Sequence, residues 1–494
     1  MQFLYVREIF VKKMVLILCL GLIGPIGSAA APSGQGFARV RKRFGEVLAR
    51  KGMRNVRSGI FVIRLDDHRV VFARNARTPL IPASNQKLVI SLAALTKLGK
   101  NYQYRTLLAR RGKDLLLIGA GDPATGDEIL AKRRGEDRFA FMDRWAKRLR
   151  KKNQTQFDTL IVRDGVFDRQ LVHPHWDRRQ LHKWYEAPVA ALNFNDNCLE
   201  ITVKGAQPGR PVELVDIFPP GFATIDNTCI TKGKSPALWL TRKPGKSRII
   251  LKGSCPSGRT TRGLVTVHDP AKLFAAILRQ RLEKNGIQIT GKTIFDHRFR
   301  NNKENSLEIL TEHRTPLADV LDRCNRRSQN LFAECLLKTL GRLPVLRGGA
   351  DRQGTWKNGG QTVETWLTGL GLDSKQFHID DGGGMSRENR LSAFVIGYLL
   401  LWADRQPFAE TFRESLSVAG VNGTLRRRFR GTFYQGRVIG KSGYLRGVVA
   451  LSGYVRCRSG RRIAFSFLMN ATSGRHPSLR TIQNTLCKIL IDEL

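Results

Sequence analysis

The stretch Ser84-Asn85-Gln86-Lys87, followed at once by the apolar run 88–95, decides how the rest of the chain is interpreted. Pro79 and Pro82 disfavour a helix before it, so the run predicts a buried helix with Ser84 at its N-terminus. Lys87 lies three residues on, most of a helical turn, so both side chains project to one side. The helix dipole favours negative charge beside the serine. A serine hydroxyl is a weak nucleophile that needs an adjacent base, and a lysine whose pKa is lowered by burial is such a base.

Two further strings, Ser328-Gln329-Asn330 and Lys441-Ser442-Gly443, follow in the C-terminal part of the chain. The first falls between two helical patterns, which predicts an interhelical loop that reaches into a cleft. The second follows a short apolar run and predicts a strand, in which Gly443 lets a ligand backbone come close. Each string alone also fits a structural role, as a helix cap, a turn or a hairpin edge. In this order they match S-x-x-K, S-x-N and K-[ST]-G, the parts of a serine acyl-transfer site.

The spacing of the strings predicts how the chain is divided. The interval from Lys87 to Ser328 is much longer than the interval from Asn330 to Lys441. A site built from all three strings requires the chain to leave and return, so much of the long interval is expected to be an insertion. Short apolar runs separated by turn residues, at 106–109, 115–118 and 198–203 among others, predict that this insertion is rich in strands.

Both flanks of the insertion carry a different pattern. An amphipathic helix is predicted from Phe37 to Leu48, and a final helix from Leu479 to Leu490. Runs on either side of Asp66-Asp67-His68, and again of Arg458-Ser459-Gly460, predict two hairpins. The fold class expected from this order is α/β, an antiparallel sheet flanked by helices and assembled from both ends of the chain.

The first thirty residues predict export. Arg7, Lys12 and Lys13 precede the apolar run 14–20, and small residues at 27–31 follow it. A basic start, a short apolar middle and a small-residue end are typical of a secretory signal peptide, here with cleavage near Ala30. An uncleaved membrane anchor is the alternative, although the run is shorter than the ~20 residues that a span needs. We therefore expect an exported protein, periplasmic or associated with the cell envelope.

The cysteine and histidine residues predict at most one disulfide and no metal site. Without Cys19 of the leader, seven of the eight cysteines remain. One disulfide among Cys198, Cys229 and Cys255 is plausible, with its pairing undetermined. Cys324 and Cys335 occupy apolar helical positions and are expected in the core. The chain has no C-x-x-C motif, and His173, His175 and His182 are expected in a loop with their ring nitrogens in water, so no metal site is predicted.

The charge is unusual for an exported chain. Lys and Arg number 84 against 41 acidic residues, a formal net charge of +43 over 494 residues. Such a field favours polyanions, yet no nucleic-acid-binding signature accompanies it, so nucleic acid is not an expected partner. An anionic wall polymer or an anionic lipid surface is the expected further partner. General solubility without a dedicated partner remains an open alternative.

The three strings and three other stretches resemble one family. The chain is similar to the D-alanyl-D-alanine carboxypeptidase/endopeptidase family of low-molecular-mass (class C) penicillin-binding proteins, over essentially its whole mature length. The further stretches that carry the resemblance are 185–197, 381–392 and 419–425. The resemblance implies a transpeptidase/β-lactamase-like sandwich with a nested insertion of one or two further domains. The expected ranges are a signal peptide at 1–30, a catalytic domain at 31–104 and 314–494, domain II at 105–127 and 205–313, and domain III at 128–204.

The same resemblance implies a role for each site residue. Ser84 would attack the carbonyl of the penultimate D-alanine of a peptidoglycan stem peptide and form an acyl-enzyme. Lys87 would take the serine proton, Ser328 would relay a proton to the departing amine, and Asn330 would orient Lys87 and the substrate amide. β-Lactams would acylate the same serine, and no cofactor is implied.

Substrate binding is implied for the third string. Lys441 would hold the terminal carboxylate, Ser442 would hydrogen-bond it, and Gly443 would let the substrate backbone approach. The backbone N–H groups of Ser84 and Tyr444 would form the oxyanion hole. Ser442 stands where the family commonly has threonine, and Tyr444 is bulkier than the residue often found there.

Two other functions stay open from the sequence. A non-catalytic wall-binding protein on the same fold would use the basic surface, although all the reactive side chains are present. A β-lactamase or esterase would use the same serine, although the large insertion fits the peptidase family better. In the second string, Gln329 replaces the usual acidic residue and so removes one negative charge beside the site.

Overall fold

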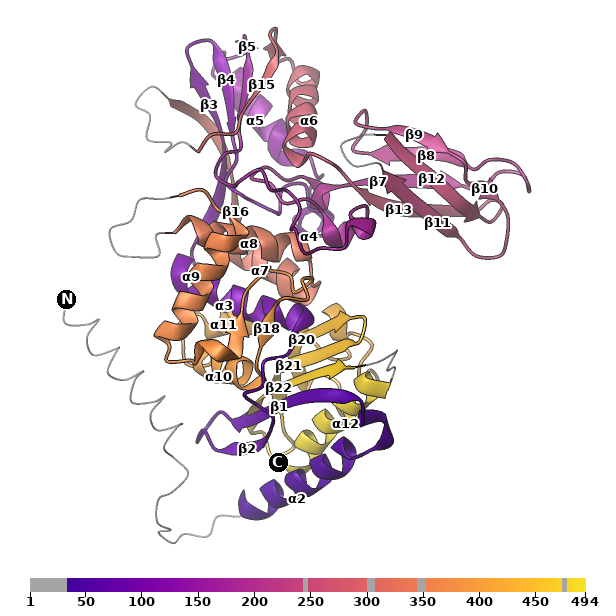
Figure 1. The fold of residues 1–494 in the computed structure, drawn as a ribbon. Coiled ribbons are helices and arrows are strands. Elements are labelled where there is room, and N and C mark those ends of the chain that lie inside the picture. The colour runs from indigo at the N-terminus through magenta and orange to yellow at the C-terminus, as the bar shows by residue number, and fades with distance from the viewer. Residues whose placement is uncertain (1–32, 243–247, 300–306, 344–351, 473–477) are drawn as a thin grey trace, which may run out of the picture.

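The computed structural model describes residues 33–242, 248–299, 307–343, 352–472 and 478–494. The predicted signal peptide, residues 1–30, lies outside these ranges. Among the helices described, none is long and apolar enough to cross a membrane. Figure 1 shows three parts: a catalytic body that contains both chain ends of the described structure, an α/β body above it, and a strand body beside the α/β body.

A six-stranded antiparallel sheet forms the centre of the catalytic body, in the order β19-β20-β21-β22-β1-β2. Its strands are β1 (Val56–Arg64), β2 (Val70–Arg74), β19 (Ser417–Val418), β20 (Val438–Leu445), β21 (Val448–Arg456) and β22 (Arg462–Ala471). The predicted hairpins are β1–β2 and β21–β22, and β1 pairs with β22 over nine residues from Val56 to Arg64. The sheet is therefore assembled from both ends of the chain, as predicted.

Helices cover both faces of this sheet. On one face lie α2 (Ser33–Leu48) and α12 (Ser478–Glu493); the other helices of this body are α3 (Gln86–Leu98), α7 (Leu317–Arg326), α8 (Asn330–Arg342), α9 (Trp356–Gly369), α10 (Ala393–Ala403) and α11 (Ala409–Ser415). Successive side chains of a strand point to opposite faces. Ile60 and Val62 of β1 accordingly belong to the core under α2 and α12, while Phe61 packs 5.2 Å from Phe394 of α10 on the other side. The α/β sandwich is confirmed.

The insertion forms two bodies of different kinds. The α/β body has a five-stranded sheet in the order β15-β6-β4-β3-β16. Its elements are β3 (Gln103–Arg111), β4 (Asp114–Ile118), α4 (Glu128–Arg133), α5 (Ala140–Lys151), β6 (Leu160–Arg163), α6 (Pro270–Lys284), β15 (Thr293–Asp296) and β16 (Glu308–Pro316). The strand body holds β7 (Cys198–Lys204), β8 (Glu213–Phe218), β9 (Thr224–Asn227), β10 (Ile230–Thr231), β11 (Ala237–Arg242), β12 (Arg248–Cys255) and β13 (Thr260–Thr266).

Strand pairing groups the inserted residues differently from the expected ranges. β6 comes from the expected domain III, 128–204, yet it pairs with β4 and with β15, which both come from the expected domain II. The strand-only part runs from 198 to 266 and crosses the expected boundary near 204. Because parallel pairing joins segments far apart in the chain, local sequence patterns do not reveal it. The domain boundaries themselves stay a prediction.

The seven cysteines of the described residues are all buried, and none of them forms a disulfide. The disulfide considered among Cys198, Cys229 and Cys255 is not formed. Cys229 and Cys255 lie in one apolar core and Cys198 is buried as well, and burial raises the pKa of Cys198 and of Cys229, so they serve as small buried residues. Cys324 and Cys335 are core residues as predicted.

Candidate active site

Ser84 lies in a short 3-10 turn, η2 (Ala83–Asn85), that leads directly into α3. Ala83 has φ of +46°, a left-handed conformation that residues other than glycine rarely adopt. Gly384 of a facing loop makes the turn possible, because a Cβ there would lie 2.0 Å from the carbonyl oxygen of Ala83. Strained turns of this kind persist where the surrounding structure holds them, and they cluster at functional sites.

Lys87 is fully buried beside the serine. Its Nζ lies 3.2 Å from Ser84 Oγ, 2.7 Å from Asn330 Oδ1 and 2.5 Å from the carbonyl oxygen of Gly383. The ammonium or amine is thus held by two acceptors and directed at the hydroxyl. The first and second strings therefore meet through the lysine.

The third string meets the second string through Lys441. Its buried Nζ donates to Ser328 Oγ at 2.7 Å and to the carbonyl oxygen of Ser442 at 2.9 Å. Ser328 lies between α7 and α8 with φ of +60°, a second left-handed residue at the site, and Asn330 is the first residue of α8. The interhelical loop and the strand are both as predicted from the sequence.

Strand β20 is fixed against the serine turn. Asn85 Nδ2 donates to the carbonyl oxygen of Lys441 at 2.8 Å, and Ser452 Oγ of β21 donates to Asn85 Oδ1 at 2.6 Å. A Cβ on Gly443 would lie 3.0 Å from Ser84 N, so only glycine lets the strand come this close without displacing the turn. Next to it the side chain of Tyr444 is 60% exposed.

Each of the three other stretches that carried the family resemblance also reaches the site. The carbonyl oxygen of Tyr185 accepts from Asn330 Nδ2 at 2.7 Å. Thr424 Oγ1 accepts from Ser442 Oγ at 2.9 Å. Gly383 binds Lys87, as described above. The side chain of Gln329 points away from the catalytic cleft, and its Nε2 donates to Asp196 Oδ2 at 2.5 Å.

Sequence reasoning missed Glu334, which is buried one helical turn after Asn330 on α8. Its carboxylate accepts from the backbone N–H of Gly382 at 2.8 Å, from that of Gly383 at 2.6 Å, and from Trp356 Nε1 at 2.8 Å. Because the carbonyl oxygen of Gly383 accepts from Lys87 Nζ, Glu334 positions the loop that holds Lys87. The i, i+4 spacing of an acid after Asn330 on an otherwise apolar face was the available signal.

Asp381 shapes the same loop from inside. Its carboxylate accepts from the backbone N–H groups of Gly384 at 2.7 Å and Ser386 at 2.6 Å, and from Trp176 Nε1 at 2.9 Å. A buried carboxylate with several N–H donors is a rigid anchor, since removing it would leave each donor unpaired. The loop 381–386 is therefore held from two sides, by Glu334 and by Asp381.

Burial lowers the pKa of both lysines of the site. Burial lowers the pKa of Lys87, although Cys324, Glu334 and Asp381 oppose the shift. Burial, and then the charge of Lys87, hold the pKa of Lys441 well below its ordinary value. Burial and the neighbouring Asp381 raise the pKa of Glu334. Desolvation is the largest cause in each case, as expected where charged forms lose water.

This arrangement predicts how acylation depends on pH. Lys87 accepts a proton only as the free amine, and its lowered pKa makes that form available below the ordinary lysine value of 10.5. The second-order rate constant for acylation by penicillin is therefore expected to rise with pH and then to reach a plateau. The midpoint of this rise is expected below pH 10.5. Stopped-flow labelling across this range measures it, and a midpoint at or above 10.5 would contradict the assignment of Lys87 as base.

Replacing Glu334 by glutamine is expected to weaken both the fold and the site. One carboxylate oxygen becomes an NH₂ group that faces an N–H donor, which costs about 1–3 kcal/mol of unfolding free energy. Acylation is expected to fall as well, because the Gly383 carbonyl loses its fixed position. Denaturant unfolding and penicillin labelling measure the two effects.

A matched control for this variant is Glu364→Gln on α9. Glu364 Oε1 accepts a backbone N–H from Ile379 at 2.8 Å, two residues before loop 381–386, and among the described residues none of its hydrogen bonds reaches that loop. Its acylation rate is expected to be unchanged. Equal effects of the two substitutions on acylation would show that Glu334 has no special connection to Lys87.

The only group of potential metal ligands within the described ranges is His173, His175 and Asp380. His173 is buried rather than in water, so that part of the prediction is wrong. Its Nδ1 accepts the backbone N–H of His175 at 3.2 Å, which leaves Nε2–H to donate to the carbonyl oxygen of Asp380 at 3.1 Å. Both ring nitrogens are used, and the cluster is better described as a hydrogen-bonded anchor beside loop 381–386 than as a metal site.

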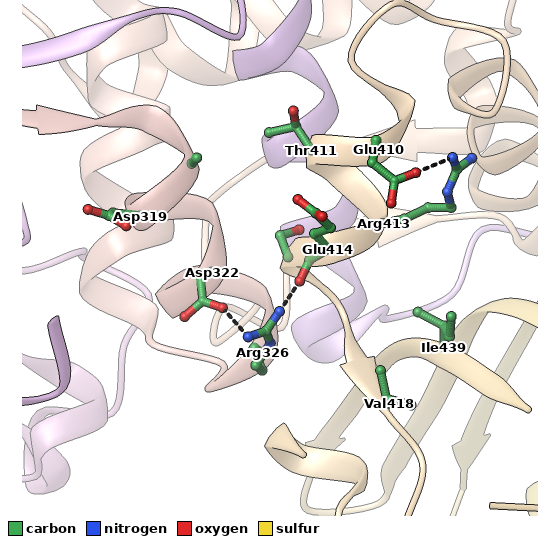
Figure 2. A pocket seen from close by; sticks show the side chains of 11 residues that line it. Asp319, Asp322, Arg326, Glu410, Thr411, Arg413, Glu414, Val418 and Ile439 are labelled. Atoms are coloured by element: carbon green, nitrogen blue, oxygen red, sulfur yellow. Dashed lines mark hydrogen bonds and ion pairs between the residues drawn. The ribbon is translucent and has the colours of Figure 1, made fainter. Parts of the chain in front are cut away.

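A cavity of about 530 Å³ lies beside the second string, between α7 and α11. Figure 2 shows its acidic side chains, among them Asp322 on α7 and Glu410 on α11. Each is already paired, Asp322 with Arg326 at 2.8 Å and Glu410 with Arg413 at 2.6 Å. No catalytic side chain lines this cavity, so it is separate from the serine site.

The fold and the site together define a serine acyl-transfer enzyme of the transpeptidase/β-lactamase-like class. The model of the D-Ala-D-Ala carboxypeptidase 3 (S13) family matches residues 40–491, and the chain belongs to this family. It is accordingly a serine-type D-Ala-D-Ala peptidase that acts on peptidoglycan.

Similar proteins cover nearly the whole chain. A D-alanyl-D-alanine carboxypeptidase of Actinomadura sp. (strain R39) is 31% identical over 93% of this chain and 86% of its own length. The D-alanyl-D-alanine carboxypeptidase DacB of Haemophilus influenzae is 24% identical over 84% of this chain and 85% of its own. The crystal structure of penicillin-binding protein 4 (dacB) from Haemophilus influenzae has a TM-score of 0.73, with 21% identity, over 90% of this chain and 97% of that one. This structural match shows the shared fold.

Proposed function

We propose that Ser84 is the nucleophile and Lys87 the general base of this peptidase. The observation that carries the proposal is the position of Lys87 Nζ, 3.2 Å from Ser84 Oγ and 2.7 Å from Asn330 Oδ1. The lysine takes the serine proton as Oγ attacks the carbonyl carbon of the penultimate D-alanine. The C–N bond then breaks, the terminal amine leaves with a proton relayed by Ser328, and water releases the acyl group from Ser84.

Lys441 and Ser442 are proposed to bind the carboxylate of the terminal D-alanine. The contact of Lys441 Nζ with Ser328 Oγ at 2.7 Å supports this, because it connects the carboxylate site to the proton relay. The N–H groups of Ser84 and Tyr444 are proposed as the oxyanion hole, and the close approach of Gly443 to Ser84 supports it. One such donor is worth roughly 3–4 kcal/mol in the transition state.

Export to the periplasm or cell envelope is proposed from the sequence of the first thirty residues. There the enzyme meets peptidoglycan stem peptides, and β-lactams are proposed to acylate Ser84. The net charge of +43 supports an anionic wall polymer or lipid surface as an additional partner.

Incubation with isolated peptidoglycan tests the proposed function. Chromatography and mass spectrometry of the products distinguish free D-alanine, which marks carboxypeptidase activity, from monomers released out of cross-linked dimers, which mark endopeptidase activity. A stable label with fluorescent penicillin is expected alongside. A label that is rapidly lost would favour a β-lactamase, and no label with no released fragment would favour a non-catalytic binding protein.

A further inference from the structure

The segment 181–186 connects the catalytic site to the strand body. At one end, the carbonyl oxygen of Tyr185 accepts from Asn330 Nδ2 at 2.7 Å. At the other end, the carbonyl oxygen of His182 accepts the backbone N–H of Thr266, the last residue of β13, at 3.2 Å. A ligand that extends beyond the catalytic cleft along this segment therefore reaches β11 and β13.

Two tryptophans are exposed along this segment, which is unusual for large apolar side chains. Trp184 is 40% exposed and Trp239 of β11 is 54% exposed. They are connected through the segment itself: Trp184 packs 5.6 Å from Tyr185, and Trp239 lies 5.9 Å from His182. Exposed aromatic side chains that gather beside an active site indicate a surface for binding a ligand or a partner.

A cavity lies beside Trp184, and a basic side chain lies beside each part of this surface. A cavity of about 280 Å³ is lined by Trp184, by Leu264 of β13, by Arg327 and by Gln329 of the second string. Its other charged lining residues pair with one another: Glu128 and Glu200 with Arg262, and Asp196 with Arg323. The Nζ of Lys183 lies 4.4 Å from the centre of the Trp239 ring. Within the part of the chain that the structure describes, neither Lys183 nor Arg327 forms an ion pair with a carboxylate.

We propose that this surface, Lys183, Trp184, Trp239, Leu264 and Arg327, binds the peptidoglycan strand on either side of the peptide that is cleaved. Sugar rings present C–H faces that pack on aromatic rings, and the carboxylates of neighbouring stem peptides complement Lys183 and Arg327. The inference rests on the proposed function, and it adds a polymer-binding surface outside the catalytic cleft. A short peptide that ends in D-Ala-D-Ala fills only the cleft and does not reach Trp239.

The test compares two substrates with three variants. For Trp239→Ala, kcat/KM on a soluble D-Ala-D-Ala tripeptide is expected to stay within about two-fold of the native enzyme. Release from isolated peptidoglycan, and sedimentation of the protein with it, are expected to fall roughly ten-fold, the loss typical of a buried aromatic contact. Trp239→Tyr keeps an aromatic face and is expected to retain most of the polymer activity.

Phe433→Ala is the matched control. Phe433 is 46% exposed and also has a cation over its ring, with Arg437 at 4.2 Å, but it precedes β20 in the catalytic body and its ring contacts are Tyr434, Arg437 and Arg458. It is expected to leave both activities unchanged. Equal polymer activity of native and Trp239→Ala enzyme would overturn the inference, as would equal losses on both substrates or in Phe433→Ala. Sedimentation with vesicles of anionic lipid that depends on Trp239, without any effect on peptidoglycan, would also overturn it.

The experiment separates this inference from the proposed function. A native enzyme that neither takes up penicillin nor cleaves the tripeptide would contradict the proposed function, whatever Trp239 does. A native enzyme that cleaves both substrates, with Trp239→Ala indistinguishable from it, would contradict only the polymer-binding surface.

Discussion

The Ser84→Ala variant is expected to lose covalent labelling by penicillin completely and to lose peptidase activity by roughly 10⁶-fold, as when a catalytic serine is removed from other serine peptidases. The loss is this large because the variant has no other hydroxyl in contact with Lys87 Nζ among the described residues. Gel fluorescence after incubation with labelled penicillin measures the first effect, and fragment release from peptidoglycan measures the second.

Binding without reaction is expected to survive in this variant, because Lys441 and Asn330 keep their contacts. Ser91→Ala provides the matched control: Ser91 lies two turns further along α3, buried, with its hydroxyl 3.0 Å from Asn325 Nδ2. That variant is expected to keep the label. Covalent label on the Ser84→Ala protein would remove Ser84 from its proposed role.

The Lys87→Met variant is expected to fold and to lose acylation by about 10²–10⁴-fold, the usual contribution of a general base. Methionine fills a similar volume without a proton acceptor. The pH dependence of acylation below 10.5 is expected to disappear together with the rate, because the titrating amine is gone. Labelling rates at several pH values measure both effects.

Lys338 offers the control for this substitution, since it is another buried lysine with a lowered pKa. Its Nζ donates to Asp168 Oδ1 at 2.6 Å and lies 3.8 Å from the ring of Trp356, away from Ser84. Lys338→Met is expected to lose about 3–5 kcal/mol of stability, because it leaves a carboxylate without its partner. The folded Lys338→Met protein is expected to be acylated by penicillin at the rate of the native enzyme. A Lys87→Met enzyme with unchanged acylation would exclude Lys87 as the base.

The three strings could be predicted because each is a local pattern with its own setting. Ser84 follows prolines and precedes an apolar run, so both the turn and helix α3 can be recognised from neighbouring residues. The sheet shared by both chain ends was predicted from the two hairpins that contain β1 and β22. These features depend on residues close in sequence, which is the information that a single chain provides.

The parts that were missed depend on partners far away in the chain. Glu334 looks like an ordinary helical acid until the Gly382–Gly383 turn folds over it. His173 is buried because loop 381–386 lies beside it, and β6 pairs with β15 across more than a hundred residues. Hydrophobic periodicity carries no information about such long-range contacts.

The pairing of β1 with β22 has a consequence for how the enzyme is made. Ser84 leaves the ribosome early, whereas Lys441 and the strand beside it are among the last segments synthesised. A growing chain therefore has the proposed nucleophile without the lysine proposed to bind the carboxylate, and the sheet beside the serine turn stays open until the C-terminal hairpin is synthesised. We therefore expect the peptidase to be inert throughout its synthesis and to become reactive only once the whole polypeptide has folded.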